Sequence, residues 1–175
     1  MEYKFFKPDW FGPQKHVFEE YLLPLKDTPL KCLEIGTYEG RSATWLLDNV
    51  LLHPDSTLDC IDPCVDGWSY WNTMYHNLSR HVRSGKCNLL QEYSEQALPK
   101  LLCRTPNQVY DFVYIDADHR PLPVIRDAIL SFMILKPGGI LALDDYPLDE
   151  VSAWHSERQF PKDSIDSFLL SHKDC

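Results

Sequence analysis

The 175-residue sequence lacks a long apolar run and an excess of basic residues, and each absence excludes a class of protein. No apolar run approaches the ~20 residues of a membrane span. The N-terminus, MEYKFFKPDW, has no apolar signal-peptide core. The net charge of −9 argues against a nucleic-acid partner, because phosphate binding needs a basic surface. We therefore expect a cytoplasmic protein that binds neither a membrane nor a nucleic acid.

Paired cysteines, repeats and low-complexity linkers are also missing. None of the six cysteines forms a C-x-x-C pair, and no histidine cluster completes a zinc site. We predict small buried thiols rather than a disulfide framework, because the chain is long enough to build an apolar core. The length predicts one domain, residues 1–175. It divides into an N-terminal arm and helix (1–29), a core (30–146) and a C-terminal segment (147–175).

The stretch Lys31–Ser42, KCLEIGTYEGRS, predicts a strand that ends at a glycine turn and continues into a helix. Parallel α/β domains build nucleotide sites in this way, with Gly36 and Gly40 giving the turn its freedom and room for a ligand. Glu34 ends the strand two positions before Gly36. A phosphate site would avoid a carboxylate there, whereas an amino group or a sulfonium would favour one.

The rest of the chain alternates between strand and helix patterns. Further strands are expected at residues 57–61, 88–91, 111–115 and 140–143, and helices at 15–23, 41–52, about 72–83, 95–102, 121–135 and 164–170, with a turn at 136–139. This alternation predicts an α/β, Rossmann-like, doubly wound and mostly parallel sheet with helices on both faces.

The predicted strand ends gather acidic and polar residues. Ligands of such sheets bind beyond the carboxyl ends of the strands. Unpaired carboxylates there would repel one another, and a bound cation would relieve the repulsion. These residues are Glu34, Asp62, Ser94, Asp116, Asp144 and Asp145.

Two subsets of these residues have more specific interpretations. Asp62 follows Gly36 by 26 positions, close to where a Rossmann-like unit places the acid that holds a ribose, although an aspartate before proline is also a common turn residue. Asp116, Asp144 and Asp145 come from strands that would be neighbours. Their carboxylates suit Mg²⁺, or they are solvated strand-end acids or helix caps.

Aromatic residues cluster in two segments. Residues 1–13 carry five aromatic rings and form either a packing arm or a lid over the site. Trp68, Tyr70, Trp71 and Tyr75 lie near the expected ligand end of the sheet, where they would cover an adenine or a substrate ring, or pack the loop.

Four segments together resemble a known family. CLEIGTYEGRSATWLL, DCIDP, DFVYIDADH and LKPGGILALDDY are similar to class I S-adenosylmethionine-dependent methyltransferases, closest to metal-dependent small-molecule O-methyltransferases of the catechol and cephalosporin-biosynthesis type. The resemblance runs from about Leu30 to Tyr146. It implies that residues 30–146 are the cofactor-binding core and that S-adenosylmethionine and Mg²⁺ are the cofactors.

The resemblance also implies roles for individual positions. His119 falls where catechol-type relatives carry a catalytic lysine, so it would act as the base, or it is held by Asp118 or a helix start. The other implied positions are Glu34, Gly36, Thr37, Gly40 and Ser42 at the methionine part, Asp62 at the ribose, Tyr93 and Ser94 near the adenine, Asp116 beside the cofactor, and Asp116, Asp144 and Asp145 around the metal.

The ending departs from the family pattern. Relatives add two antiparallel strands after the fifth helix, whereas this sequence stops at Cys175, so the fold is expected to lack them and the sequence is a natural short form or a fragment. An exposed sheet edge would then invite a partner strand or a homodimer.

The function expected is methyl transfer from S-adenosylmethionine to a hydroxyl oxygen of a small-molecule acceptor, assisted by a divalent metal. One alternative is a non-catalytic module that only binds S-adenosylmethionine. The other is a nicotinamide-dependent oxidoreductase. The loop disfavours it, because it reads E-x-G-x-x-x-G rather than G-x-G-x-x-G.

Overall fold

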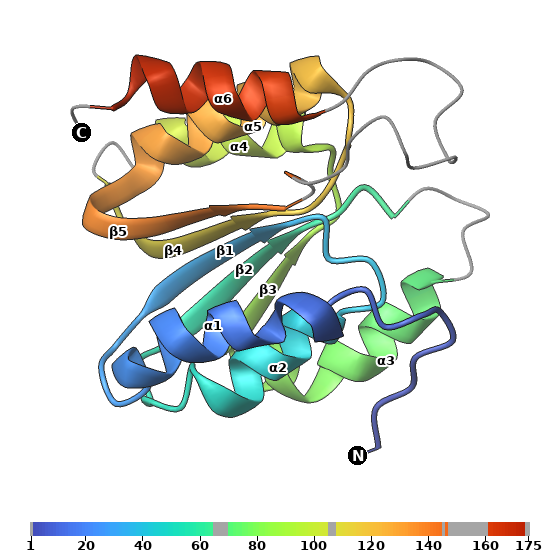
Figure 1. Cartoon of the computed structure of the whole chain (residues 1–175). Coiled ribbons are helices and arrows are strands. Elements are labelled where there is room, and N and C mark those ends of the chain that lie inside the picture. Colours follow the sequence, from blue (N-terminus) through green and yellow to red (C-terminus); the bar gives the residue numbers. More distant parts are fainter. Residues whose placement is uncertain (1, 65–69, 105–107, 145, 147–160, 174–175) are drawn as a thin grey trace.

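A parallel sheet separates two layers of helices in the computed structural model, which describes residues 2–64, 70–104, 108–144, 146 and 161–173 (Figure 1). The five strands run in the order β3-β2-β1-β4-β5, and every neighbouring pair is parallel. The strand order reverses direction at β1 and β4, which is where parallel α/β sheets place their ligands. The Rossmann-like α/β fold expected from the sequence is confirmed.

The element bounds follow the predicted alternation closely. The strands are β1 (Lys31–Ile35), β2 (Thr57–Ile61), β3 (Cys87–Leu90), β4 (Tyr110–Ile115) and β5 (Leu135–Leu143). The α-helices are α1 (Lys15–Leu22), α2 (Arg41–Asn49), α3 (Tyr70–Arg83), α4 (Ser94–Arg104), α5 (Pro121–Ile134) and α6 (Pro161–Ser171), and short 3₁₀ turns span Gly12–Gln14 and Leu23–Leu25.

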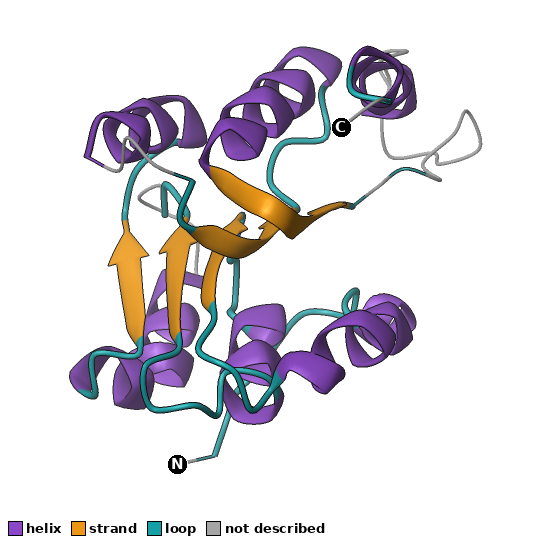
Figure 2. Ribbon diagram, turned by 90° about the vertical axis from the view of Figure 1, so that its left-hand side faces the viewer, coloured by secondary structure: helices purple, strands orange, loops and turns teal. Residues whose placement is uncertain are grey.

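Alternating side chains on the central strands pack into two separate hydrophobic cores, one on each face of the sheet. Helices α1, α2 and α3 cover one face of the sheet, and α4, α5 and α6 cover the other, as the labels of Figure 1 show; Figure 2 shows the two helix layers from the side. In β1, Cys32 belongs to the first core, whereas Leu33 and Ile35 belong to the second. Because successive strand residues point to opposite faces, Glu34 points to the same face as Cys32. A polar side chain is therefore buried at the end of an otherwise apolar strand.

The sequence predicted a turn at Lys136–Gly139 before the last strand. This start of the strand is wrong, because these residues lie within β5. The pairs Tyr110–Leu135 and Phe112–Ile140 enclose an irregularity, with five steps along β5 against two along β4. Pro137 has no N–H to donate, so it interrupts the ladder, and the pairing resumes at Ile140.

In the part of the chain that the structure describes, the sheet ends at β5 and contains no antiparallel strand. This agrees with the fold expected from the sequence. The homodimer that a free edge would favour stays a prediction. None of the helices in these ranges is long and apolar enough to cross a membrane.

Five of the six cysteines lie in the described ranges, and all five are free thiols. The prediction of buried thiols holds for Cys32, Cys60, Cys64 and Cys87. It is wrong for Cys103, which is exposed on the last turn of α4. Cys175 lies outside the described residues.

Candidate functional site

The strand register places the predicted acids in one row at the carboxyl edge of the sheet. Ile35 pairs with both Ile61 and Ile115, and Ile115 pairs with Leu143. The residues that follow these four are Gly36, Asp62, Asp116 and Asp144, and all four backbone N–H groups still donate to the neighbouring strand at 2.8–3.2 Å. The convergence that the sequence predicted is therefore fixed by the backbone.

Gly36 lets the ends of β1 and β4 approach each other. Its φ is +90°, and a Cβ at this position would lie 1.9 Å from the carbonyl oxygen of Asp116. No side chain fits there. From the sequence we expected the glycine to make room for a ligand, but the atoms that need the room belong to Asp116 and Ala117.

The glycine loop, residues 36–40, contacts the residue that follows β2. Gly40 has a φ of +79°, donates its N–H to the carbonyl of Thr37 at 2.8 Å, and precedes the first residue of α2. Tyr38 also has a positive φ, +49°. Its N–H donates to Asp62 Oδ2 at 2.9 Å. The loop is thus held in one conformation by a contact with the candidate ribose acid.

Glu34 is completely buried, and none of the described residues supplies a cationic partner. Its Oε1 accepts a hydrogen bond from the Ser42 hydroxyl at 2.5 Å. The pKa of Glu34 is raised to about 8, mainly by burial. The charge of Asp116 contributes to this rise, and the Ser42 hydrogen bond acts against it. The Thr37 hydroxyl is close enough to lower this pKa, yet it is buried without a partner in good hydrogen-bond geometry. Across the described ranges, no lysine or arginine pairs with Glu34.

Asp62 is almost buried, and protein donors occupy both of its oxygens. Oδ1 accepts the Cys64 N–H at 2.9 Å and the Tyr70 hydroxyl at 3.1 Å, and Oδ2 accepts the Tyr38 N–H. Burial and the charge of Asp62 raise the pKa of Tyr70 above its usual range, so its hydroxyl stays protonated and donates. A ribose hydroxyl that bound Asp62 would have to share these oxygens or replace Tyr70.

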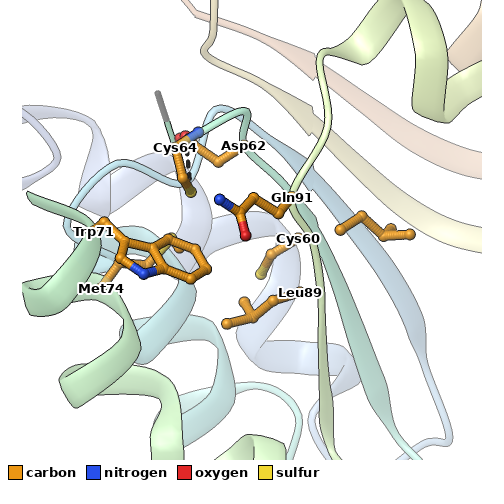
Figure 3. Close-up of a pocket in the computed structure, with 8 residues that line it drawn as sticks. Cys60, Asp62, Cys64, Trp71, Met74, Leu89 and Gln91 are labelled. Atoms are coloured by element: carbon orange, nitrogen blue, oxygen red, sulfur yellow. Dashed lines mark hydrogen bonds between the residues drawn. The ribbon is translucent and has the colours of Figure 1, made fainter. Parts of the chain in front are cut away.

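A small hollow lies beside Asp62, between α3 and the ends of β2 and β3 (Figure 3). Trp71 and Met74 face it from α3, and Cys60 and Leu89 face it from the strands. Its volume is about 140 Å³, including open solvent. This volume is not enclosed space, so the hollow does not by itself form a pocket for a cofactor. Of the other two aromatics predicted here, Tyr75 is exposed on α3 with its ring centroid 6.1 Å from that of Trp71, and Trp68 lies outside the described residues.

Asp116 and Asp144 are joined by a tyrosine that the sequence analysis did not single out. The Tyr114 hydroxyl lies 2.5 Å from Asp144 Oδ2 and 3.1 Å from Asp116 Oδ2. Gln14 Nε2 lies 3.4 Å from Asp144 Oδ1. Burial, and then the two carboxylates, raise the pKa of Tyr114 far above its usual range. The available signal was the period of two, which puts Tyr114 and Asp116 on one face of β4.

Asp116 and Asp144, two of the three residues predicted to bind a metal, thus lie close together, whereas Asp145 lies outside the described residues. Among the residues that the structure places, no group of three His, Cys, Asp or Glu side chains could hold a metal ion. Asp116 and Asp144 do bring carboxylate oxygens to one hydroxyl, and such oxygens are the donors that Mg²⁺ prefers.

Tyr93 and Ser94 lie just beyond β3, at the start of α4. The Tyr93 ring is half exposed. Ser94 Oγ accepts from Arg126 at 3.2 Å and bonds to the buried Asp127, so its side chain also joins α4 to α5. A contact with an adenine would have to coexist with this structural role.

His119 follows the end of β4 and is partly buried. Asp118 is occupied by Arg120, which donates to it through the side chain and the backbone at 2.6–3.1 Å. Burial raises the pKa of Asp118, but the hydrogen bonds from Arg120 and the nearby His119 bring it below its usual value. The main partner of Asp118 is therefore Arg120.

Known proteins resemble this chain in both sequence and fold. A protein of Acanthamoeba polyphaga mimivirus is 30% identical over 82% of this chain and 65% of its own length. A probable caffeoyl-CoA O-methyltransferase of Dictyostelium discoideum is 25% identical over 77% of this chain and 51% of its own length. The O-methyltransferase from Bacillus cereus, solved in complex with SAH, has a TM-score of 0.71 and 15% identity, and the match covers 94% of this chain and 70% of that one.

The chain thus spans about half to two-thirds of the length of these two curated relatives. Residues 33–146 match the family described as "Methyltransferase domain". The match includes the glycine loop and all four positions of the strand-end row. The protein belongs to this methyltransferase family.

Proposed function

We propose that this protein transfers a methyl group from S-adenosylmethionine to a hydroxyl oxygen of a small molecule. The observation that carries the proposal is Glu34, a fully buried carboxyl with no cationic partner in the described ranges, next to a row of further acids. A buried charge is normally paired, so such a site favours a ligand that brings its own positive charge. The relatives, one of them solved with SAH, support the same cofactor.

The residues around the glycine loop fit this cofactor. Glu34 would accept a hydrogen bond from the ammonium group in the methionine part of the cofactor. The buried Thr37 hydroxyl would hydrogen-bond to the same part. Ser42 would hold the Glu34 carboxyl in position through their 2.5 Å hydrogen bond. Asp62 would bind the ribose hydroxyls. When bound, the cofactor supplies a methyl group on a sulfonium, which is already activated for transfer.

Gly36, Gly40, Tyr93 and Ser94 complete the proposed cofactor contacts. The two glycines hold the loop in its positive-φ conformation. Tyr93 and Ser94 stand beyond the end of β3, the neighbour of β2 in the sheet, and would lie near the adenine.

The acceptor would bind over Asp116 and Asp144. Holding acceptor and methyl group in line is the main contribution of the protein, because the donor is already activated. A divalent metal held by Asp116, Asp144 and Asp145 would lower the pKa of the acceptor hydroxyl. His119 would take the proton near neutral pH.

The experiment measures methyl transfer to a panel of catechol, phenol and sugar hydroxyls, in EDTA and after Mg²⁺ is restored. We expect turnover that EDTA abolishes and Mg²⁺ restores. Turnover that EDTA leaves unchanged would remove the metal but keep the methyltransferase. Tight SAH binding without turnover on any acceptor would instead support the non-catalytic module. That outcome has a structural motive, because protein donors already occupy Asp62.

A further inference from the structure

The N-terminal arm, defined here as residues 2–14, follows a path that joins α3 to the end of β5. Near its start, the arm is fastened to α3 and α2, where Tyr3 bonds to Asp48 and Arg80. At its end, Gln14 contacts Asp144 in the strand-end row. Between these points, two buried side chains hold the backbone of the arm against α3 and the glycine loop.

Asn77 is the first of these side chains. It is fully buried on α3, its Oδ1 accepts the Lys4 N–H at 2.8 Å, and its Nδ2 donates to the Lys4 carbonyl at 2.8 Å. The same amide donates to the backbone carbonyl of Glu39 at 2.9 Å. One side chain therefore ties the arm and the glycine loop to the same helix.

Glu39 is the second, and it belongs to the loop itself. Only 4% exposed, its carboxylate accepts the backbone N–H groups of Phe6 at 3.1 Å and Lys7 at 3.2 Å. No lysine or arginine pairs with it anywhere in the described ranges. A nearly buried carboxylate needs hydrogen bonds, and the arm supplies them.

The arm also reaches the candidate ribose acid through a series of tilted ring contacts. Trp10 packs on Tyr38 with 5.7 Å between the ring centroids, and Tyr38 packs on Tyr70 at 4.4 Å. Tyr70 in turn donates to Asp62. The indole of Trp10 is 60% exposed, so its removal should cost little stability.

We propose that Glu39 and Asn77 are positioning residues that make the arm a part of the cofactor site, so that arm docking and cofactor binding strengthen each other. The inference rests on the proposed function, because it takes the glycine loop as the cofactor loop. Both events require one conformation of residues 36–40. An event that fixes this conformation lowers the cost of the other, and the resulting coupling is reciprocal.

The experiment uses the full chain and SAH as the probe. Amide hydrogen exchange of residues 2–9 is followed by mass spectrometry with and without saturating SAH, and the dissociation constant of SAH is measured by calorimetry. Saturating SAH should slow exchange of the arm amides by about 5-fold or more, because coupling between sites typically spans a 5- to 150-fold range.

Substitutions on the loop side and on the arm side test the coupling from both directions. Glu39→Ala should weaken SAH binding by about 5- to 30-fold and leave arm exchange fast with or without SAH. Trp10→Ala should weaken binding by about 3-fold, because it removes one ring contact to the loop. Their matched controls are Glu20→Gln, an exposed glutamate on α1, and Phe6→Ala, an arm ring that is 75% exposed, and both should bind SAH like the unaltered chain.

A purely structural role of Glu39 would lower thermal stability without any effect of SAH on arm exchange. Two results would overturn the inference and leave the proposed function intact. In the first, the unaltered chain binds SAH tightly but SAH does not change the exchange of the arm amides. In the second, Trp10→Ala binds SAH with the same affinity as the unaltered chain. Failure of the unaltered chain to bind SAH would overturn both. If Glu39→Ala does not fold, the pair Trp10→Ala and Phe6→Ala decides the question.

Discussion

Two buried carboxyls, one on each side of the sheet, have opposite surroundings. Asp127 on α5 is 1% exposed, and it lies within 3.2 Å of Arg126 and bonds to Ser94. Glu34 on β1 is equally buried, but its hydrogen bonds come from Ser42 and the Cys60 thiol. Burial raises the pKa of both groups, and only at Asp127 does a cation act against it.

The difference separates a structural acid from a candidate ligand-binding acid. Asp127 has its cationic partner, Arg126, on the same helix, and its bond to Ser94 joins α5 to α4. These contacts stabilise the folded chain whether or not a ligand is bound. Glu34 stands at the ligand end of the sheet, where burial without a cation disfavours its ionised form, an arrangement typical of functional sites. Four predictions test this comparison.

The largest effect should come from the glycine that brings Glu34 near the other acids. Gly36→Ala should lower the free energy of unfolding by about 3 kcal/mol or more, because a Cβ would overlap the backbone of Asp116 and Ala117, just after β4. Gly85→Ala is the matched control. It has a similar φ of +78° with nothing within 4 Å, so it should cost about 1–2 kcal/mol. Denaturant unfolding of both variants measures the difference, and equal costs would show that the contact is not limiting.

Glu34→Gln should mainly affect ligand binding. The amide keeps the shape and a hydrogen bond to Ser42 but loses the negative charge. SAH affinity should fall by about 30-fold, because truncating one partner of a buried charge pair costs ~2 kcal/mol or more. The free energy of unfolding should change by less than about 1 kcal/mol. Calorimetry and urea unfolding on one preparation check both values, and a large loss of stability with normal SAH affinity would make Glu34 a structural acid.

Asp127→Ala should show the reverse pattern. It deprives Arg126 and Ser94 of a buried partner, so the free energy of unfolding should fall by about 1–3 kcal/mol. SAH affinity should fall by less than fivefold, because Asp127 meets the proposed site only through Ser94. An effect on SAH binding as large as that of Glu34→Gln would contradict the separation.

The pH dependence should be the smallest and most specific effect. In the folded protein the pKa of Glu34 is about 8, above its ordinary value of 4.5, so the native state holds this proton more tightly than the unfolded state. Its contribution to stability is therefore full below pH 4.5 and is lost as the pH rises to 8.

An ammonium ligand favours the ionised form of Glu34. Between pH 6 and 8 its binding must therefore release a proton, and SAH affinity should rise by up to about tenfold per pH unit. Above pH 8 the dependence should level off, and Glu34→Gln should remove it. Calorimetry at several pH values tests this, and a flat profile in the unaltered chain would show that Glu34 is ionised before the ligand arrives.

The sequence alone was enough for the fold and for the row of acids. The period of the apolar residues gives the alternation of strands and helices, and the carboxyl ends of parallel strands meet at one edge of the sheet. Glu34, Asp62, Asp116 and Asp144 could therefore be placed on one edge before any coordinates. The family resemblance supplied the proposed roles, and residues 33–146 match that family.

Only the tertiary structure decided which of these acids have partners. Examples are the contacts of Tyr114 with two carboxylates, of Tyr70 with Asp62, and of the arm with Glu39, which join residues 2 to 33 positions apart. These contacts depend on the direction of side chains and on the path of loops, and the spacing of residues in the sequence encodes neither. The same holds for Gly36, whose need for a missing Cβ arises from a strand about 80 positions away. Local periodicity sets the elements, whereas burial and pairing depend on what the rest of the chain brings to each position.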